Sequence, residues 1–425
     1  MGSLPVSISD QFPVGTGIYF EPKEINKRIG LIEKGFDPDR LTEINHFAQR
    51  VIDSSMTPGM QILVAKSGEI IYHKSFGYHT YDNKIKVENH HLYDLASLTK
   101  ITATLPLIMR EVDLNNFSLD TSLEDFMPEL KGSNKANLSV KEVLSHYARL
   151  TPWIPFYKET LDEKGQQLRK FYRNSHKYRY DIPVAQDLYL RSNFNQIIEK
   201  QVIESPLLDS LNYRYSDLPY YLFKNYFERK YKKPLDVLAH EFLYEPLGLE
   251  RTLFNPWKVM SKNEIVPSEI DNYFRHRELR AYVHDMGAAM QGGVGGHAGL
   301  FSNAEEVYKI MQMYLQKGKA NGHEFIASKT LNDFNRCYYC NQGNRRGVGF
   351  DKPQLEGNGS TCGCVSDISF GHMGFTGTYA WVDPDQELIF VFLSNRTYPS
   401  MSNNLLGKNN IRTRMQKLVY KALIH

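Results

Sequence analysis

The sequence lacks the features that mark several large classes of protein. Its 51 lysines and arginines nearly balance 48 aspartates and glutamates, so the net charge is only +3. No basic tract is interleaved with aromatic residues, which argues against a nucleic-acid partner. No apolar run approaches the roughly 20 residues that a membrane-spanning helix needs. With 41% hydrophobic and 23% charged residues, the 425-residue chain is typical of a globular protein with one large or two closely packed domains.

A signal peptide is also absent, and cysteine is scarce. The first three residues, Met1-Gly2-Ser3, are typical of an expression tag, so the missing export signal says little about the compartment. The four cysteines form two close pairs, Cys337/Cys340 and Cys362/Cys364. Such pairs fit disulfides in an exported protein, free thiols or a zinc knuckle. Of these three interpretations the zinc knuckle is the least favoured, because the second pair has C-x-C spacing and no histidine lies beside it at ligand spacing.

The two ends of the chain carry the strand signals. Residues 1–36 are expected to be an extension or linker, because residues 4–36 contain several prolines and glycines and show no clear period. Asp37-Pro38 predicts the start of a helix. A hairpin follows over 61–66 and 69–76, turning at Ser67-Gly68. Near the other end, 378–382 and 387–393 flank a turn signal, and Asn410 precedes a final helix.

The middle of the chain reads differently. Residues 115–280 show mainly helical patterns, including 139–150 and 234–244, and no convincing sheet; 156–200 looks surface-exposed. The predicted fold class is α/β (α+β): an antiparallel sheet flanked by helices, with an inserted helical domain. The sheet domain is expected from 37–114 and 281–425, and the inserted domain from 115–280.

The tetrad Ser97-Leu98-Thr99-Lys100 is the first candidate for chemistry. On a helix, Ser97 and Lys100 lie one turn apart on the same face. A serine hydroxyl becomes a useful nucleophile when a neighbouring base takes its proton, and a buried lysine with a lowered pKa can be that base. The tetrad alone is common by chance, and taken alone it is better explained by a solvated lysine near a helix cap.

Two later segments supply possible partners. Tyr215-Ser216-Asp217 precedes an apolar helix, and a tyrosine beside a cation can relay a proton. Phe370–Gly377 is glycine-rich and precedes the terminal hairpin, so a strand edge there can approach a ligand and offer an amide to an oxyanion. Packed side chains with a helix cap, and a bulged edge strand, are the plainer interpretations. Gly292–His297 predicts tight turns near a cleft.

In this order, the three segments resemble the boxes of the serine β-lactamase and penicillin-binding-protein superfamily, in its class C-like branch. Members carry S-x-x-K, Y-x-N, and K-T-G or H-x-G; here the boxes are Ser97–Lys100, Tyr215–Asp217 and His372–Gly374. The resemblance runs from about residue 38 to 424 and includes Gly295–Ser302 and Gly374–Thr378. It implies a β-lactamase/transpeptidase-like fold.

The nearest likeness is to the C-terminal module of composite Bacteroidetes envelope proteins, in which a family-three glycoside hydrolase precedes it. Leu4–Ile8 and Gly15–Gly17 resemble the tail of that hydrolase. The resemblance therefore implies a cell-envelope (periplasmic or exported) protein, with an N-terminal glycoside hydrolase module as a possible partner in a longer chain.

The resemblance also assigns roles. Ser97 would be the nucleophile, Lys100 its base and Tyr215 the group that shares the proton. The amides of Ser97 and Phe375 would hold the oxyanion, next to Gly374. His372 would replace the box-three lysine, contacting Tyr215 or a substrate carboxylate. No metal or cofactor is implied.

Three departures from the family pattern bear on function. Asp217 replaces the usual asparagine and would help keep Lys100 charged, which opposes its role as a base. Met373 replaces a threonine whose hydroxyl would bind a β-lactam carboxylate. Arg149 stands where relatives often carry glycine.

The leading hypothesis is a serine hydrolase that forms an acyl-enzyme with an ester or amide, such as a D-amino-acid peptide or a muropeptide fragment. The alternative is a weakly catalytic or non-catalytic peptidoglycan-binding module. A true β-lactamase is less expected because of Met373.

Overall fold

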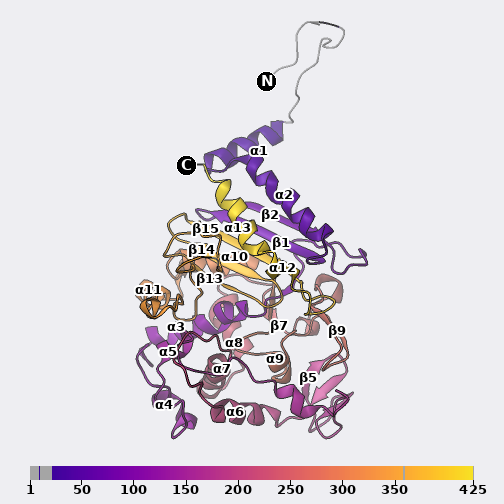
Figure 1. Cartoon of the computed structure of the whole chain (residues 1–425), viewed down its shortest axis with the longest axis vertical. Helices are drawn as coiled ribbons and strands as arrows, with labels where there is room; N and C mark the ends of the chain where they lie inside the picture. Colours follow the sequence, from indigo (N-terminus) through magenta and orange to yellow (C-terminus); the bar gives the residue numbers. More distant parts are fainter. Residues whose placement is uncertain (1–8, 10–21, 358, 425) are drawn as a thin grey trace.

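The computed structural model describes residues 9, 22–357 and 359–424 of the chain. Its centre is a five-stranded antiparallel sheet in the order β13-β14-β15-β1-β2 (Figure 1). The strands are β1 (Gly59–Lys66), β2 (Glu69–Gly77), β13 (Phe370–Met373), β14 (Tyr379–Asp383) and β15 (Leu388–Ser394). The register pairs Leu63 of β1 with His73 of β2 and Val391 of β15. The predicted sheet built from both ends of the chain is therefore confirmed, as are both hairpins.

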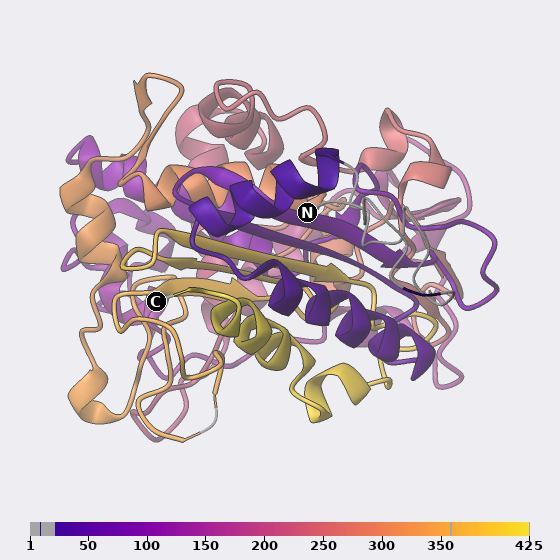
Figure 2. The ribbon, with the colours of Figure 1, turned by 90° about the horizontal axis from the view of Figure 1, so that it is seen from above.

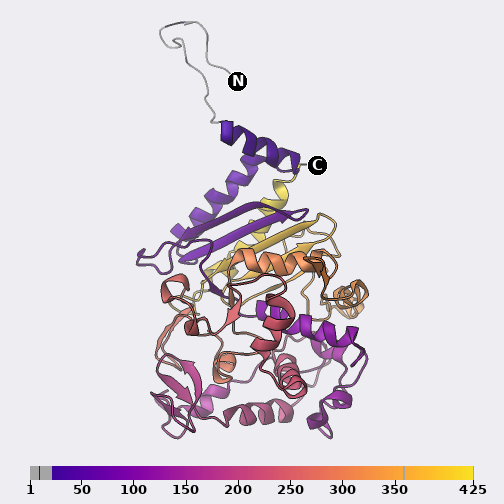
Figure 3. The same ribbon diagram turned by 180° about the vertical axis from the view of Figure 1, so that it is seen from behind.

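Helices cover both faces of this sheet because its central strands are apolar on both sides. On the outer face lie α2 (Pro38–Asp53) and α13 (Ile411–Lys421), side by side in the view from above (Figure 2). Asp37 caps α2 by accepting hydrogen bonds from the amides of Asp39 and Arg40, with Pro38 in the first turn. On the inner face lies α10 (Ala304–Leu315), as the view from behind shows (Figure 3).

The remaining helices connect or surround these layers, most of them below the sheet in Figure 1. They are α1 (Pro22–Glu33), α3 (Leu105–Asp113), α4 (Leu123–Phe126), α5 (Val140–Leu144), α6 (Phe194–Glu204), α7 (Leu218–Tyr231), α8 (Leu235–Ala239), α9 (Met286–Met290), α11 (Ser328–Asn335) and α12 (Leu405–Lys408). Two π-helical turns, Lys100–Thr104 and His240–Tyr244, directly precede α3 and follow α8. Within the described part of the chain, no helix has the length and apolar character needed to cross a bilayer.

Short strands form four small sheets beside the main one. They are β3 (Tyr93–Asp94), β4 (Tyr172–Arg173), β5 (Ile182–Ala185), β6 (Leu188–Leu190), β7 (Leu253–Phe254), β8 (Glu269–Asp271), β9 (Arg277–Leu279), β10 (Leu300–Ser302), β11 (Lys319–Ala320) and β12 (His323–Glu324). They pair in the orders β3-β10-β7, β4-β6-β5, β8-β9 and β11-β12.

Three expectations need correction. Residues 22–33 are helical rather than irregular, while Leu4–Ile8 and Gly15–Gly17 lie outside the described residues. The middle of the chain does contain sheets, whose strands of two to four residues are too short to show an alternating pattern. The segment 156–200 is mostly exposed, as expected, although some of its residues, such as Leu188 and Phe194, are buried. The helix expected over 139–150 ends at Leu144, before His146 and Arg149 adopt positive φ.

The cysteine pairs are disulfides. Cys337 is bonded to Cys340 and Cys362 to Cys364. The disulfide interpretation is confirmed, and the free-thiol and zinc interpretations are wrong because both pairs of sulfurs are consumed.

Candidate active site

The candidate nucleophile lies where a short strand turns into a helix. Asp94, at the end of β3, accepts a hydrogen bond of 2.8 Å from the amide of Ala96, which has a φ of +47°. The chain then turns so that the Lys100 amide donates to the Ser97 carbonyl at 3.1 Å, and the π-helical turn begins at Lys100. Such π-helical turns occur frequently at functional sites.

Three side chains meet at the Ser97 hydroxyl. Lys100 Nζ donates a hydrogen bond of 2.9 Å to Ser97 Oγ, and the Tyr215 hydroxyl donates one of 3.1 Å to the same oxygen. Tyr215 comes from the segment before α7, 118 residues along the chain. The first two boxes of the sequence are thus brought together around one oxygen atom.

Lys100 is fully buried and makes further polar contacts. Its Nζ lies 2.7 Å from Asp217 Oδ1 and 3.1 Å from the His297 carbonyl oxygen, to which it donates. Burial alone would lower the Lys100 pKa, but the neighbouring Asp217 carboxylate and the Tyr215 hydroxyl raise it overall. Lys100 is therefore a stable cation in this arrangement, as Asp217 in the second box suggested.

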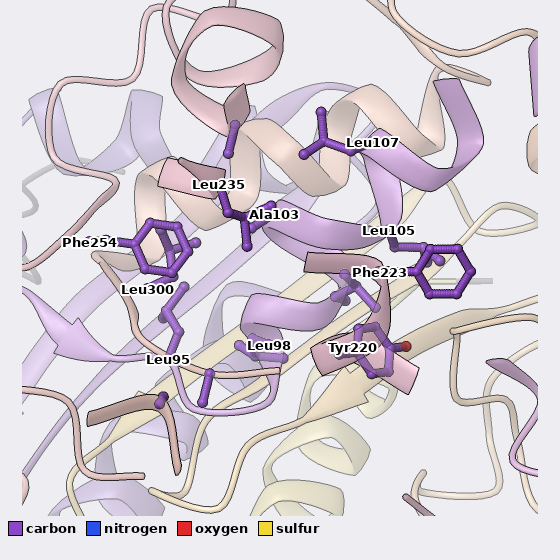
Figure 4. Packing of buried hydrophobic residues seen from close by; sticks show 14 of the residues in the cluster. Leu95, Leu98, Ala103, Leu105, Leu107, Tyr220, Phe223, Leu235, Phe254 and Leu300 are labelled. Carbon is purple, nitrogen blue, oxygen red and sulfur yellow. The ribbon is translucent and has the colours of Figure 1, made fainter. Parts of the chain in front are cut away.

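Apolar residues enclose this end of the helix. Leu95, Leu98 and Ala103 pack with Tyr220 and Leu300, all of them almost wholly buried (Figure 4). This packing fixes the helix that carries Lys100 and keeps water from its ammonium group.

Tyr215 lies between buried nitrogen groups from three segments. Its ring centroid is 4.5 Å from that of His146, 5.9 Å from that of His372 and 5.1 Å from the Arg346 guanidinium carbon. Burial raises the Tyr215 pKa, and the charge of Lys100 lowers it only in part. Tyr215 is accordingly a neutral phenol that donates to Ser97.

The third box, on β13, provides a neutral histidine. His372 Nδ1 lies 2.8 Å from the Met373 carbonyl oxygen, so this nitrogen carries the proton and donates. Burial, followed by the charges of Arg346 and Lys100, lowers the His372 pKa well below its usual value. His372 therefore takes the position of the box-three lysine without supplying its positive charge.

Gly374 lets the end of β13 approach Ser97. A methyl group at this position would lie 2.0 Å from Thr378 Oγ1 and 2.6 Å from the Leu95 carbonyl oxygen. The amides of Ser97 and Phe375 donate to no acceptor within residues 22–357 and 359–424. Both residues line the same cavity, so these two amides are available to an oxyanion.

The glycine-rich run before β10 shapes the back of the site. A methyl group on Gly296 would lie 2.2 Å from the Tyr220 carbonyl oxygen. The Gly296 carbonyl accepts from Thr104 Oγ1 at 2.7 Å, and the next carbonyl, that of His297, accepts from Lys100. His297 Nε2 also lies 2.8 Å from Asp285 Oδ1. The run thus packs against the Lys100 helix, and its predicted place near a cleft is confirmed.

The cavity above Ser97 has a volume of about 850 Å³ and is lined by two contrasting sets of side chains. One set is aromatic, with Trp153, Phe156, Tyr157 and Tyr221; the other consists of Arg345, Arg346, Arg396 and Arg412. The sequence analysis missed both sets, because their members come from several helices and loops and share no recognisable motif. The adjacent pair Arg345-Arg346 in an otherwise polar loop was the available signal.

A cluster of possible metal ligands lies apart from this cavity, at Glu88, His90 and His91. Arg280 donates to His79 Nδ1, so His79 Nε2 carries a proton and donates to His91 Nδ1 at 2.8 Å. The Glu88 amide donates to the same nitrogen. The proton of neutral His91 therefore sits on Nε2, which leaves that nitrogen unable to bind a metal in this arrangement.

Comparisons with known proteins show the family of the chain. Residues 47–411 match the beta-lactamase family. A putative D-alanyl-D-alanine carboxypeptidase of Salmonella typhimurium is 28% identical over 408 residues, covering 88% of this chain and 87% of the relative.

Solved structures share the fold. A penicillin-binding protein homologue from Pyrococcus abyssi has a TM-score of 0.61 at 17% identity, covering 88% of this chain and 77% of its own. EstCE1, a hydrolase with promiscuous acyltransferase activity, has a TM-score of 0.63 at 16% identity, covering 90% and 98%. Because the family match spans most of the chain and its boxes meet in one cavity, this protein belongs to the beta-lactamase family of hydrolases.

Proposed function

We propose that this protein is a serine hydrolase that cleaves an ester or amide through an acyl-enzyme on Ser97. The observation that carries the proposal is the set of hydrogen bonds from Lys100 and Tyr215 to Ser97 Oγ at the base of a cavity. The amides of Ser97 and Phe375 have no acceptor within the described residues, and both residues line this cavity, so the two amides suit a tetrahedral oxyanion.

The chemistry follows from these contacts. Ser97 Oγ attacks the substrate carbonyl carbon, and the hydroxyl proton passes to the coupled Lys100–Tyr215 pair. The leaving amine or alcohol takes that proton as the acyl bond breaks. Water then attacks the ester on Ser97, delivers its proton through the same pair and restores the hydroxyl. Because Asp217 holds Lys100 as a cation, the pair must give up one proton before attack.

The cavity supports a substrate with a carboxylate near the scissile bond. The four arginines that line the cavity, Arg345, Arg346, Arg396 and Arg412, favour an anionic group. Together with relatives named as putative D-alanyl-D-alanine carboxypeptidases, this supports a D-amino-acid peptide or muropeptide substrate and a cell-envelope location. An N-terminal glycoside hydrolase module in a longer chain would fit the same setting. β-Lactam hydrolysis is less favoured because Met373 offers no hydroxyl.

Intact-mass spectrometry tests the proposal. The wild type is incubated with a small panel of β-lactams, p-nitrophenyl esters and D-alanyl-D-alanine peptides. A covalent acyl adduct that maps to Ser97, and is absent from Ser97→Ala, is the expected result. Ser192→Ala, at an exposed serine remote from the cavity, should acylate like the wild type. Equal behaviour of wild type and Ser97→Ala would refute the proposal.

A second function is favoured by one observation, the ion pair between Lys100 and Asp217. If Lys100 keeps its proton throughout, the cavity binds muropeptides without cleaving them. Calorimetry would then detect binding, while mass spectrometry would find no product over several hours. Turnover that depends on Ser97 would exclude this alternative.

A further inference from the structure

The positive charge around Tyr215 does not come from the third box. His372 is a neutral histidine, and the charge of Lys100 is matched by Asp217 at 2.7 Å. His146, on another side of the ring, is also neutral: its Nδ1 accepts from the Ser216 amide, and burial lowers its pKa well below the usual value.

Arg346 is the remaining charged group that faces this ring. Its side chain is almost wholly buried, and its guanidinium carbon lies 5.1 Å from the centre of the Tyr215 ring. Arg346 Nε donates to the Tyr213 hydroxyl at 3.4 Å, which anchors the side chain. Nη1 is buried and has no hydrogen-bond partner within the described residues, so part of the guanidinium makes no hydrogen bond to another group there.

Asp351 does not cancel this charge. Arg345 Nη2 lies 2.9 Å from Asp351 Oδ1, whereas Arg346 Nε lies 3.8 Å from the same oxygen. Two guanidinium groups therefore share one carboxylate and leave an excess of one positive charge. Arg345 stands farther off, over the Tyr213 ring at 5.8 Å, with 23% of its side chain exposed. Of the two guanidinium groups, Arg346 therefore has the stronger electrostatic effect on Tyr215.

We propose that Arg346 is a positioning residue that holds the Tyr215 phenol beside Ser97 and stabilises it as its proton is lost. In this role it supplies the positive charge that His372 does not bring to the third box. The proposal rests on the proposed serine hydrolase function.

The consequence is a particular pH dependence. Activity requires the Lys100–Tyr215 pair to lose a proton, so it rises with pH through the apparent pKa of that pair. A positive charge at Arg346 stabilises the deprotonated pair and moves this rise to lower pH, whereas Asp217 opposes it. Removing the Arg346 charge should move the rise to higher pH by about one unit, as for a single charge within 4–6 Å.

The test measures kcat/KM for a p-nitrophenyl ester across about pH 5–10, corrected with Ser97→Ala. Arg346→Met should shift the rising limb upward by about one pH unit, with partial recovery of activity at alkaline pH. Arg346→Lys keeps the charge and should shift it much less. Arg345→Met, which removes the neighbouring charge over Tyr213, should produce the smaller shift of the two methionine variants.

Two outcomes would overturn the proposal. A limb that stays in place in Arg346→Met, with activity reduced in proportion at every pH, would show a purely structural role and overturn the proposal. An Arg345→Met shift as large as that of Arg346→Met would also overturn it. If Arg346→Met does not fold, Arg346→Gln removes the charge while keeping hydrogen-bond donors, and the same criteria apply. Failure of the proposed function is distinguishable, because the wild type would then form no Ser97-dependent product.

Discussion

At the residue scale, the ion pair between Asp217 and Lys100 bears directly on the protonation state of Lys100. Burial lowers the Lys100 pKa, but the Asp217 carboxylate and the Tyr215 hydroxyl together raise it and keep Lys100 protonated. We expect Asp217→Asn, which restores the usual family residue, to lower the Lys100 pKa and raise kcat/KM near neutral pH. Each unit of pKa lowering makes the free base about tenfold more abundant. The pH–rate profile measures the effect as a shift of the rising limb to lower pH.

A carboxylate on the same cavity provides the control for this prediction. Asp285 is paired with His297 at 2.8 Å rather than with Lys100. Asp285→Asn should therefore leave the rising limb much closer to that of the wild type. If Asp217→Asn and Asp285→Asn shift the rising limb equally, loss of the Asp217–Lys100 ion pair is not the cause of the shift.

Gly374 provides a second test at this scale. A methyl group there would meet Thr378 Oγ1 at 2.0 Å and the Leu95 carbonyl at 2.6 Å, and a carbonyl of the backbone cannot rotate away as a side chain can. We expect Gly374→Ala to push the Phe375 amide away from Ser97 and to reduce acylation about 100-fold, the usual cost of losing one oxyanion donor. Stopped-flow acylation with a chromogenic ester measures this loss.

The matched change is Gly30→Ala in α1. No atom lies within 4 Å of the added methyl group there, and the position is remote from the cavity. Its acylation rate should equal that of the wild type. A Gly374→Ala variant with unchanged acylation would show that the oxyanion donors lie elsewhere.

The sequence predicted some residues of the site better than others. The sequence singled out Ser97, Lys100, Tyr215 and His372 because each sits in a short box with a fixed spacing, and the structure brings these four residues together. Arg346 was not found, because a pair of adjacent arginines has no characteristic spacing and its place over Tyr215 depends on the tertiary fold. The positive φ of His146 was likewise not predicted, because the sequence does not show that the helix ends at Leu144.

At the element scale, the segment between α11 and β13 carries both disulfides and the Arg345-Arg346 pair. The bonds link residues only three and two positions apart, so they close very small loops. We expect the double change Cys362→Ser/Cys364→Ser to lower the free energy of unfolding by about 2 kcal/mol or less. Urea denaturation measures this, and hydrogen exchange should show faster exchange mainly within 353–369.

The other cysteine pair supplies the comparison. Cys337→Ser/Cys340→Ser alters the part of the segment next to Arg345-Arg346 and should affect kcat/KM more than the first double change. If the Cys362/Cys364 variant fails to fold, the bond does more than close a short loop, and the expected modest effect is wrong.

Elements differed in how well the sequence revealed them. β1, β2, β14 and β15 were predicted because each is long enough for its apolar pattern and is joined by a clear turn signal. The strands β4 to β6 were missed, since two to four residues cannot show a period and their pairing is decided by contacts within the fold. The proposed division into domains at 114 and 281 stays a prediction.

At the scale of the whole molecule, the site is a product of chain topology. The five-stranded sheet joins β1 and β2 from one end of the chain to β13–β15 from the other. Ser97 follows the first hairpin, Tyr215 comes from the middle segment and His372 lies on the edge strand β13. The proposed nucleophile, proton relay and oxyanion strand therefore meet only when all three parts are folded, so we expect activity to depend on the integrity of the entire chain.

The same burial makes the stability of the molecule sensitive to acid. His146 and His372 are both held neutral, with pKa values well below the usual 6.5, by burial and by the charge of Arg346. The unfolded chain takes up protons at these residues below about pH 6.5, whereas the folded chain does not. Their contribution to stability is therefore complete above that pH and falls as the pH decreases. Each histidine should cost ~1.4 kcal/mol per pH unit below about pH 6.5.

Urea unfolding at about pH 7.5 and about pH 5.5 tests this, with His146→Asn as the informative variant. Asparagine tolerates the φ of +56° at this position, and its side-chain oxygen can accept from the Ser216 amide as Nδ1 does. Because the asparagine side chain does not titrate, the variant should lose ~1.4 kcal/mol less stability than the wild type over this pH change. An identical loss in both proteins would mean that His146 takes up its proton over the same pH range in the folded chain as in the unfolded chain. The buried neutral environment assigned to Tyr215 would then be wrong as well, because the two rings are in contact.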